Sequence, residues 1–246
     1  LAALFRRLDP SRPALANSGA GDGHTYPGWY WGSWTDVHEL PGGALVSEYG
    51  AEAVPVLETL RTFLPEGSTA DDWAYHGFQH YENEVKAGVT WDMPVHEVIE
   101  RTQRYQALII QNSTETYRRK KRERVQGVLQ FMLVDPWPCI SWSVLDIDRR
   151  PKLGYEALRR CMQPVLPSIE ADGNTHPEGD AVNFGVWWIN DHPRTFRDST
   201  LSWSLLDAGG STLQSASTSV HLLADDARRV MQAGPFVLHP GEYRLT

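Results

Sequence analysis

The sequence places a carboxylate where many enzymes keep a catalytic group. Glu48 directly follows the apolar segment 44–47, which has the composition of a short buried strand. In barrel enzymes the catalytic side chains lie at the carboxyl ends of the strands. Most glutamates are solvated surface charges, so Glu48 becomes a candidate nucleophile or acid only with support from neighbouring segments.

Two neighbouring segments supply that support. His24 and Tyr26 precede the strand of Glu48, and Trp137 follows the next strand-like run of the chain. A phenol can hydrogen-bond a carboxylate and hold it ionised and oriented, and an indole face can form the floor of a sugar-binding subsite. Each aromatic residue alone could be a core residue. The ordered set, at successive strand ends, favours a carbohydrate site.

The elements that would position these residues alternate between strand and helix in the first two thirds of the chain. Helical spacing of apolar residues predicts helices over 54–64, 95–124 and 152–162, and apolar runs predict buried strands over 14–18, 44–47 and 127–134. This alternation is typical of a parallel sheet. After Pro164 and Pro167 the pattern changes to short alternating runs between turn signals, at 182–189, 201–206, 218–223 and 236–239, which predicts an antiparallel β-sandwich.

Composition narrows the function classes. The chain has 246 residues, a formal net charge of -8 and 41% hydrophobic residues, so it is long and apolar enough for a globular core. The acidic balance gives no electrostatic reason to bind nucleic acid or an anionic membrane, and no run of about 18 apolar residues exists. Cys139 and Cys161 are most simply buried free thiols. The ten tryptophans suit a partner with sugar rings.

Four motifs resemble glycoside hydrolase family 2, and most closely its β-mannosidase and exo-β-glucosaminidase-like members. In chain order they are Asp22-Gly23-His24-Thr25-Tyr26, Val46-Ser47-Glu48-Tyr49-Gly50, the segment from Gly127-Val128-Leu129-Gln130-Phe131 through Asp135-Pro136-Trp137-Pro138 to Ser143, and Pro151-Lys152. The resemblance implies an α/β plus all-β chain. Residues 1–164 would form the C-terminal half of a (β/α)8 TIM barrel, strands five to eight, and residues 165–246 an immunoglobulin-like β-sandwich cut short at its C-terminus.

The resemblance also implies roles for individual residues. Glu48 would be the nucleophile of a retaining exo-β-glycosidase and Tyr26 would orient it. The implied substrate-binding residues are His24, Asp135, Trp137, Trp31 and Trp34, the last two on the aglycone side. Val134 stands where mannosidase-like members often have Asn, which leaves the sugar open among mannose, glucosamine, galactose and glucuronic acid. Neither a metal nor an organic cofactor is required by this chemistry.

One required group is missing from the sequence. Retaining hydrolysis uses two carboxyl groups about 5–5.5 Å apart, a nucleophile and an acid/base. In this family the acid/base is the Glu of an Asn-Glu pair that ends strand four, and the only such pair here, Asn83-Glu84, follows strand seven. Residues 1–8 read as an amphipathic helix already in progress. We therefore expect a fragment that lacks its general acid and whose partner is the N-terminal half of the same enzyme.

Three other interpretations compete with this one. A Trp-rich chain could be a non-catalytic carbohydrate-binding or structural module, which would need no oriented nucleophile. His76 and His80, with Glu82 and Glu84 nearby, have a spacing that can place two imidazoles on one helix face for a metal, but they lack the Glu beside the first His of a zinc-protease motif. The basic stretch 118–124 could contact nucleic acid, or could complement the dipole at a helix C-terminus.

Overall fold

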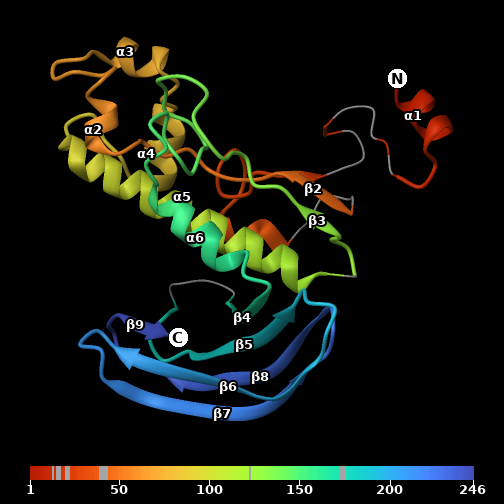
Figure 1. Ribbon diagram of the computed structural model, residues 1–246. Helices are drawn as coiled ribbons and strands as arrows, with labels where there is room; N and C mark the ends of the chain where they lie inside the picture. The colour runs from red at the N-terminus through yellow and green to blue at the C-terminus, as the bar shows by residue number, and fades with distance from the viewer. Residues whose placement is uncertain (13, 15–17, 20–22, 39–43, 122, 172–175) are drawn as a thin grey trace. The chain divides into compact units, whose positions relative to one another are not determined.

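A computed structural model describes residues 1–12, 14, 18–19, 23–38, 44–121, 123–171 and 176–246. The chain divides into two compact units (Figure 1). The first contains residues 1–117 and 122–161, and the second contains residues 118–121 and 162–246. The division after Cys161 lies close to the change of sequence pattern at Pro164.

The first unit is built around three parallel strands. These are β1 (Gly23–His24), β2 (Leu45–Glu48) and β3 (Gly127–Val128), in the order β1-β2-β3. His24 is in register with Glu48, and the backbone N–H of Phe131 donates to the carbonyl oxygen of Tyr49 at 3.0 Å. Because the strands are parallel, their carboxyl ends meet at one edge of the sheet, which brings the chain after β1, β2 and β3 together.

The strand predicted over 127–134 is much shorter than expected. The last backbone hydrogen bond to β2 comes from Leu129, Phe131 binds Tyr49 just after β2, and Met132 instead exchanges backbone hydrogen bonds with Trp142 and Val144. Leu133 is 59% exposed, so this run is not buried on both faces. The prediction was wrong because an apolar run looks alike in a buried strand and in an irregular segment. The strand predicted over 14–18 falls largely outside the described residues.

The first unit also contains six α-helices and one 3-10 helix among its described residues. They are α1 (Ala2–Leu8), the 3-10 helix η1 (Trp34–His38), α2 (Leu57–Leu60), α3 (Ala70–Tyr75), α4 (His80–Ala87), α5 (Val95–Arg119) and α6 (Leu153–Cys161). The helix predicted over 54–64 is confirmed only as the short α2, whereas α6 agrees with the prediction. Neither α3 nor α4 was predicted, since they are too short for a clear apolar period. A capping box of Thr69 and Asp72 begins α3.

The long helix α5 organises the core of the first unit. Ile109 packs with Trp29 and Ala51, while Ile110 packs with Val144 and with Ala157 of α6. Of the helices described, even the 25-residue α5 is too polar to cross a lipid bilayer. Through the contacts of Ile109, the apolar side of α5 packs against the chain that follows β1 and β2.

The second unit is antiparallel. Its strands are β4 (Val165–Glu170), β5 (Ala181–Asn190), β6 (Phe196–Asp207), β7 (Thr212–Leu222), β8 (Asp226–Val237) and β9 (Tyr243–Leu245). They form two three-stranded sheets, β4-β5-β8 and β7-β6-β9, that share one core around Val186, Trp203 and Phe236. The runs predicted over 182–189 and 201–206 lie within β5 and β6, whereas those over 218–223 and 236–239 extend one and two residues past the ends of β7 and β8.

The basic residues at the end of α5 serve the second unit. Arg118 and Lys121 lie 2.8 Å and 2.6 Å from the carboxylate of Asp191, and Lys121 also pairs with Asp225 at 2.6 Å. Arg119 donates to the hydroxyl of Ser168 at 2.6 Å. These cations are engaged in structural contacts, which does not favour the nucleic-acid interpretation.

Candidate active site

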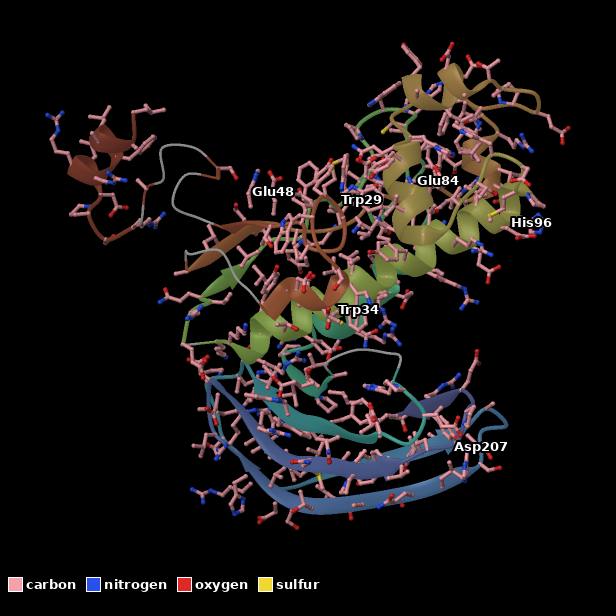
Figure 2. The ribbon with its side chains drawn as sticks, turned by 180° about the vertical axis from the view of Figure 1, so that it is seen from behind. Trp29, Trp34, Glu48, Glu84, His96 and Asp207 are labelled. Atoms are coloured by element: carbon pink, nitrogen blue, oxygen red, sulfur yellow. The ribbon has the colours of Figure 1, made fainter. Side chains whose placement is uncertain are left out.

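Glu48 lies at the carboxyl end of β2 (Figure 2), and both of its side-chain oxygens have polar partners. The hydroxyl of Tyr26 donates to Oε2 at 2.8 Å, and Nε2 of His24 lies 2.8 Å from Oε1. The parallel register produces this arrangement, because the backbone N–H of Thr25, between the two donors, binds the carbonyl oxygen of Glu48 at 2.9 Å. The Glu48 side chain keeps 23% of its surface exposed. The carboxylate is therefore held in orientation and still reachable by a ligand.

Tyr26 is suited to act as a donor to this carboxylate. Burial, the hydrogen bond to Glu48 and the charge of Glu48 all raise the pKa of the Tyr26 hydroxyl far above its usual range. Tyr26 consequently keeps its proton at any physiological pH. A donor fixed in this way stabilises the ionised form of its partner and restricts its rotation.

A row of aromatic rings begins at Tyr26. The ring centres of Tyr26 and Tyr30 are 5.4 Å apart, those of Tyr30 and Trp142 are 6.1 Å apart, and those of Trp142 and Phe131 are 6.3 Å apart. Tyr30 is 52% exposed. Aromatic faces beside a carboxylate can bind a sugar ring, because the faces contact its apolar C–H groups and the polar groups bind its hydroxyls.

The sequence interpretation did not single out Tyr30, Trp142 or Phe131. Phe131 lies three residues after β3 and donates its backbone N–H to Tyr49, the residue that follows β2. Trp137 lies six residues further along the chain, so closeness to the end of the strand is the signal that could have indicated Phe131. Tyr30 lies between Trp29 and Trp31, and the sequence offers no reason to prefer it over these tryptophans.

The predicted aromatic residues occupy different surroundings. Trp137 is 40% exposed and packs against Tyr75 and His76, with its ring stacked on His76 at 5.4 Å. Trp31 is also 40% exposed. Trp34 begins η1 and packs with the core cluster around Trp29 (Figure 2), and its carbonyl oxygen accepts a hydrogen bond from Asn112 at 2.6 Å. The structure thus records Trp34 as a packing residue of the loop and leaves Trp31 and Trp137 accessible.

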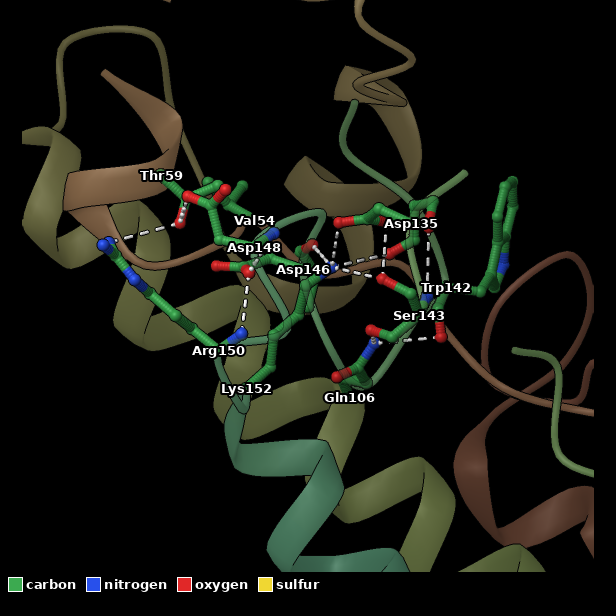
Figure 3. Close-up of polar contacts among 12 residues, drawn as sticks. Val54, Thr59, Gln106, Asp135, Trp142, Ser143, Asp146, Asp148, Arg150 and Lys152 are labelled. Atoms are coloured by element: carbon green, nitrogen blue, oxygen red, sulfur yellow. Dashed lines mark hydrogen bonds and ion pairs between the residues drawn. The ribbon is translucent and has the colours of Figure 1, made fainter. Parts of the chain in front are cut away.

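Asp135 is a buried acid held by two serines. It is only 2% exposed, and its Oδ1 accepts hydrogen bonds from the hydroxyls of Ser141 and Ser143 (Figure 3). The two serine hydroxyls give Asp135 a structural role in this arrangement, and its assignment to substrate binding stays a prediction. The sequence could not reveal these hydrogen bonds, because the two serines lie in the irregular chain after the third strand.

Lys152 completes a buried charge network with Asp135. Its ammonium group is fully buried, lies 3.6 Å from Oδ2 of Asp135, and donates to the carbonyl oxygen of Ala53 at 2.8 Å and the hydroxyl of Ser143 at 2.9 Å (Figure 3). Burial lowers the pKa of Lys152, and the charges of Asp135 and Glu52 oppose that shift. The network ties the chain that follows β2 to the segment that carries Trp142.

Glu52 is a second buried acid, four residues after Glu48. Its Oε1 accepts hydrogen bonds from the backbone N–H of Gln79 at 3.0 Å and from Nδ2 of Asn83 at 2.7 Å. Burial raises the pKa of the Glu52 carboxyl to about 8, with a smaller upward effect from Glu82, while Gln79, Asn83 and Lys152 oppose the rise. The raised pKa favours the protonated form of Glu52, which makes this carboxyl unsuited to be a nucleophile.

This raised pKa predicts a pH-dependent stability. The folded protein binds the Glu52 proton more tightly than the unfolded chain, whose carboxyl has a pKa of 4.5. The stabilisation is complete below pH 4.5 and declines as the pH rises towards about 8. Relative to the Glu52→Gln variant, the wild type should lose stability across this window and change no further above it. Urea denaturation at pH 5, 6.5 and 8 measures the difference, and a constant difference would contradict the prediction.

The alternative metal site is not supported by the geometry. Nδ1 of His76 lies 2.7 Å from the carbonyl oxygen of Pro138, whereas the ring of His80 stacks on Trp91 at 4.2 Å. Within the described parts of the chain, no group of three or more His, Cys, Asp and Glu side chains is arranged to hold a metal ion.

The Asn83-Glu84 pair does not supply a second catalytic carboxyl. The buried Asn83 side chain donates a hydrogen bond to Glu52, and the carboxylate of Glu84, on α4, lies 3.7 Å from Nδ1 of His80. Figure 2 shows Glu84 well apart from Glu48. Cys139 and Cys161 are both buried thiols that form no disulfide within the described residues, as predicted.

Comparison with known proteins shows which proteins this chain is similar to. No family model matches the sequence. The chain is 28% identical over 178 residues to β-mannosidase B of Thermothelomyces thermophilus, covering 64% of this chain and 20% of that protein. It is 29% identical over 209 residues to β-mannosidase of Rattus norvegicus, covering 75% of this chain and 22% of that protein. The chain thus spans about a fifth of the length of these relatives.

Solved structures agree in fold. The crystal structure of β-D-mannosidase from Dictyoglomus thermophilum superposes with a TM-score of 0.74 at 21% identity, covering 93% of this chain and 29% of that one. The exo-chitosanase CsxA of Amycolatopsis orientalis superposes with a TM-score of 0.56 at 17% identity, covering 90% and 27%. The chain is therefore similar to β-mannosidases in sequence and shares the fold of these solved structures, in agreement with the predicted resemblance to glycoside hydrolase family 2.

Proposed function

We propose that these residues form part of a retaining exo-β-glycosidase that hydrolyses terminal β-linked sugars of the mannoside type. The observation that carries the proposal is the Glu48 carboxylate at a strand end, with one oxygen bound by the hydroxyl of Tyr26 and the other by His24. The β-mannosidase relatives support the substrate class. The fold likeness supports the assignment of residues 1–164 to half of a (β/α)8 barrel and of residues 165–246 to an immunoglobulin-like domain.

In this mechanism Glu48 attacks the anomeric carbon of the terminal sugar. The glycosidic C–O bond breaks as the ester bond between Glu48 and the sugar forms, and the leaving oxygen takes a proton from the acid/base. Water then attacks the same carbon, loses its proton to the acid/base and releases Glu48. Two inversions give net retention.

The acid/base is proposed to come from a part of the enzyme outside these residues. The described partners of Glu48 are Tyr26 and His24, neither of which is a carboxyl group. Loss of general acid catalysis typically costs about 10²–10⁴-fold in rate for a poor leaving group. A substrate with a good leaving group therefore offers a test that does not depend on the acid.

The test is covalent labelling by 2-deoxy-2-fluoro-β-D-mannosyl fluoride. Its fluoride departs without a general acid, and its C2 fluorine slows hydrolysis of the intermediate, so an ester should accumulate on the peptide that contains Glu48. Glu48→Gln should prevent labelling. A carbohydrate-binding module would bind mannosides without forming the adduct. Absence of an adduct in the full-length, mannoside-hydrolysing protein, or an adduct on another residue, would overturn the proposal.

Removal of the Tyr26 hydroxyl should slow catalysis without abolishing it. Tyr26→Phe deletes a hydrogen bond to a charged group, which is worth roughly 1.5–3 kcal/mol, or about 10–100-fold in kcat/KM. Steady-state hydrolysis of 4-nitrophenyl β-D-mannoside measures the loss. Tyr81→Phe is the matched control, because Tyr81 is 72% exposed and should give wild-type rates. Equal rates for the two variants would remove Tyr26 from the mechanism.

A further inference from the structure

One amide side chain holds two consecutive aromatic residues of the loop after β1. Oε1 of Gln79 accepts a hydrogen bond from the indole N–H of Trp29 at 3.1 Å, and Nε2 of Gln79 donates to the hydroxyl oxygen of Tyr30 at 3.1 Å. Trp29 is 1% exposed, whereas Tyr30 is 52% exposed. Gln79 therefore fixes a buried anchor and, beside it, a ring that faces solvent.

Gln79 is itself fixed by a buried acid. It stands immediately before α4, and its backbone N–H donates to Oε1 of Glu52 at 3.0 Å. The same oxygen accepts a hydrogen bond from Asn83, whose Nδ2 also donates to the backbone carbonyl oxygen of Gln79 at 2.9 Å. Glu52 and Asn83 are both 0% exposed. Gln79 is thus held through its backbone, and its side-chain amide binds Trp29 and Tyr30 of the loop.

The ring that Gln79 holds adjoins the Glu48 site. Tyr30 packs edge-on against Tyr26 at 5.4 Å, and Tyr26 donates to Glu48 at 2.8 Å. On its other side Tyr30 lies 6.1 Å from the ring of Trp142. The rotation of Tyr30 consequently decides how the exposed part of this aromatic row is presented next to the carboxylate.

We propose that Gln79, seated on Glu52, is a positioning residue that sets the orientation of Tyr30 beside Glu48 and thereby the affinity for the sugar substrate. The proposal rests on the glycosidase function proposed above. Gln79 acts through the phenol of Tyr30 and not on the reacting bond. Its removal should therefore raise KM more than it lowers kcat.

The test is a double-mutant cycle in the full-length enzyme with 4-nitrophenyl β-D-mannoside as substrate. Gln79→Met keeps the length of the side chain and deletes both hydrogen bonds, and Tyr30→Phe deletes only the phenol group that Gln79 binds. Each variant should raise KM by about fivefold to tenfold, as for loss of a neutral hydrogen bond, with kcat within about twofold. The double variant should be no worse than Gln79→Met, because both changes remove the same interaction.

Two controls separate positioning from general damage. Gln79→Glu can still accept from both the Trp29 N–H and the Tyr30 O–H, so it should restore most of the affinity. Gln111→Met makes the same replacement at an exposed position of α5, where the amide of Gln111 donates to Glu115, and should leave KM unchanged.

The outcomes distinguish this inference from the function on which it rests. An unaltered KM for Gln79→Met, or effects that add in the double variant, would overturn the role of Gln79 in an enzyme that remains active. An inactive full-length wild type that also fails to form the fluoromannosyl adduct would instead overturn the function.

Discussion

Replacement of Glu48 by Gln is expected to lower kcat for 4-nitrophenyl β-D-mannoside by a factor on the order of 10⁵, the scale seen when a covalent nucleophile is removed. An amide oxygen carries no charge with which to attack the anomeric carbon. The amide nitrogen of the new side chain would also face either the hydroxyl of Tyr26 or Nε2 of His24, both of which lie 2.8 Å from a Glu48 oxygen. KM should change far less than kcat.

Azide rescue sharpens this prediction. In Glu48→Ala the vacated space admits a small anion, which attacks the anomeric carbon once and gives an α-mannosyl azide of inverted configuration. Glu66→Gln is the matched control, because Glu66 is 94% exposed and should be indifferent both to the substitution and to azide. A β-configured azide, or wild-type rates in Glu48→Gln, would show that another residue forms the intermediate.

The central group of the site was predictable because it depends only on local order and parallel pairing. Glu48 follows a short apolar run, and parallel strands bring the chain after each strand to one edge. The register pairs His24 with Glu48, and the side chains of Tyr26 and His24 each lie 2.8 Å from a Glu48 oxygen. Of the two strand ends, only that of β2 was recognised, because β1 lies at Gly23–His24 whereas the preceding strand was predicted over 14–18.

The third strand shows where such reasoning fails. An apolar run from Gly127 onwards does not reveal that the last backbone hydrogen bond to β2 comes from Leu129 and that Met132 turns to bind Trp142. Trp137 was predicted to follow this strand, whereas Phe131 is the aromatic residue whose backbone binds Tyr49, just after β2. The hydrogen bonds of Asp135 were not predictable for the same reason, because its partners Ser141 and Ser143 lie beyond the turn.

The segment between α2 and α5 was the least predictable part of the first unit. Its helices α3 and α4 have six and eight residues, too few to display an apolar period. Gln79 and Asn83 acquire their significance only from Glu52, which lies 27 and 31 positions earlier in the chain. Contacts of this range are fixed by tertiary packing and have no local signature.

The buried ion pair beneath the site supplies the second large expected effect. Lys152→Met should destabilise the folded protein by about 3–5 kcal/mol, because Asp135 would remain buried without its cation. The side chains of Lys152 and Asp135 are 0% and 1% exposed, so water cannot replace the lost partner. Urea denaturation followed by tryptophan fluorescence measures the loss. Hydrogen exchange of residues 132–153 should show it concentrated in the segment that carries Trp142.

Two further variants identify the cause of that loss. Asp135→Asn added to Lys152→Met removes the orphaned charge but keeps an oxygen for the hydroxyls of Ser141 and Ser143, so the double variant should be more stable than Lys152→Met alone. Arg104→Met breaks an ion pair with Glu100 in which the two side chains are 71% and 55% exposed, and should change stability by less than about 1 kcal/mol. If the double variant gained nothing, the packing of the Lys152 side chain and not its charge would be what holds the chain after β2 to the Trp142 segment.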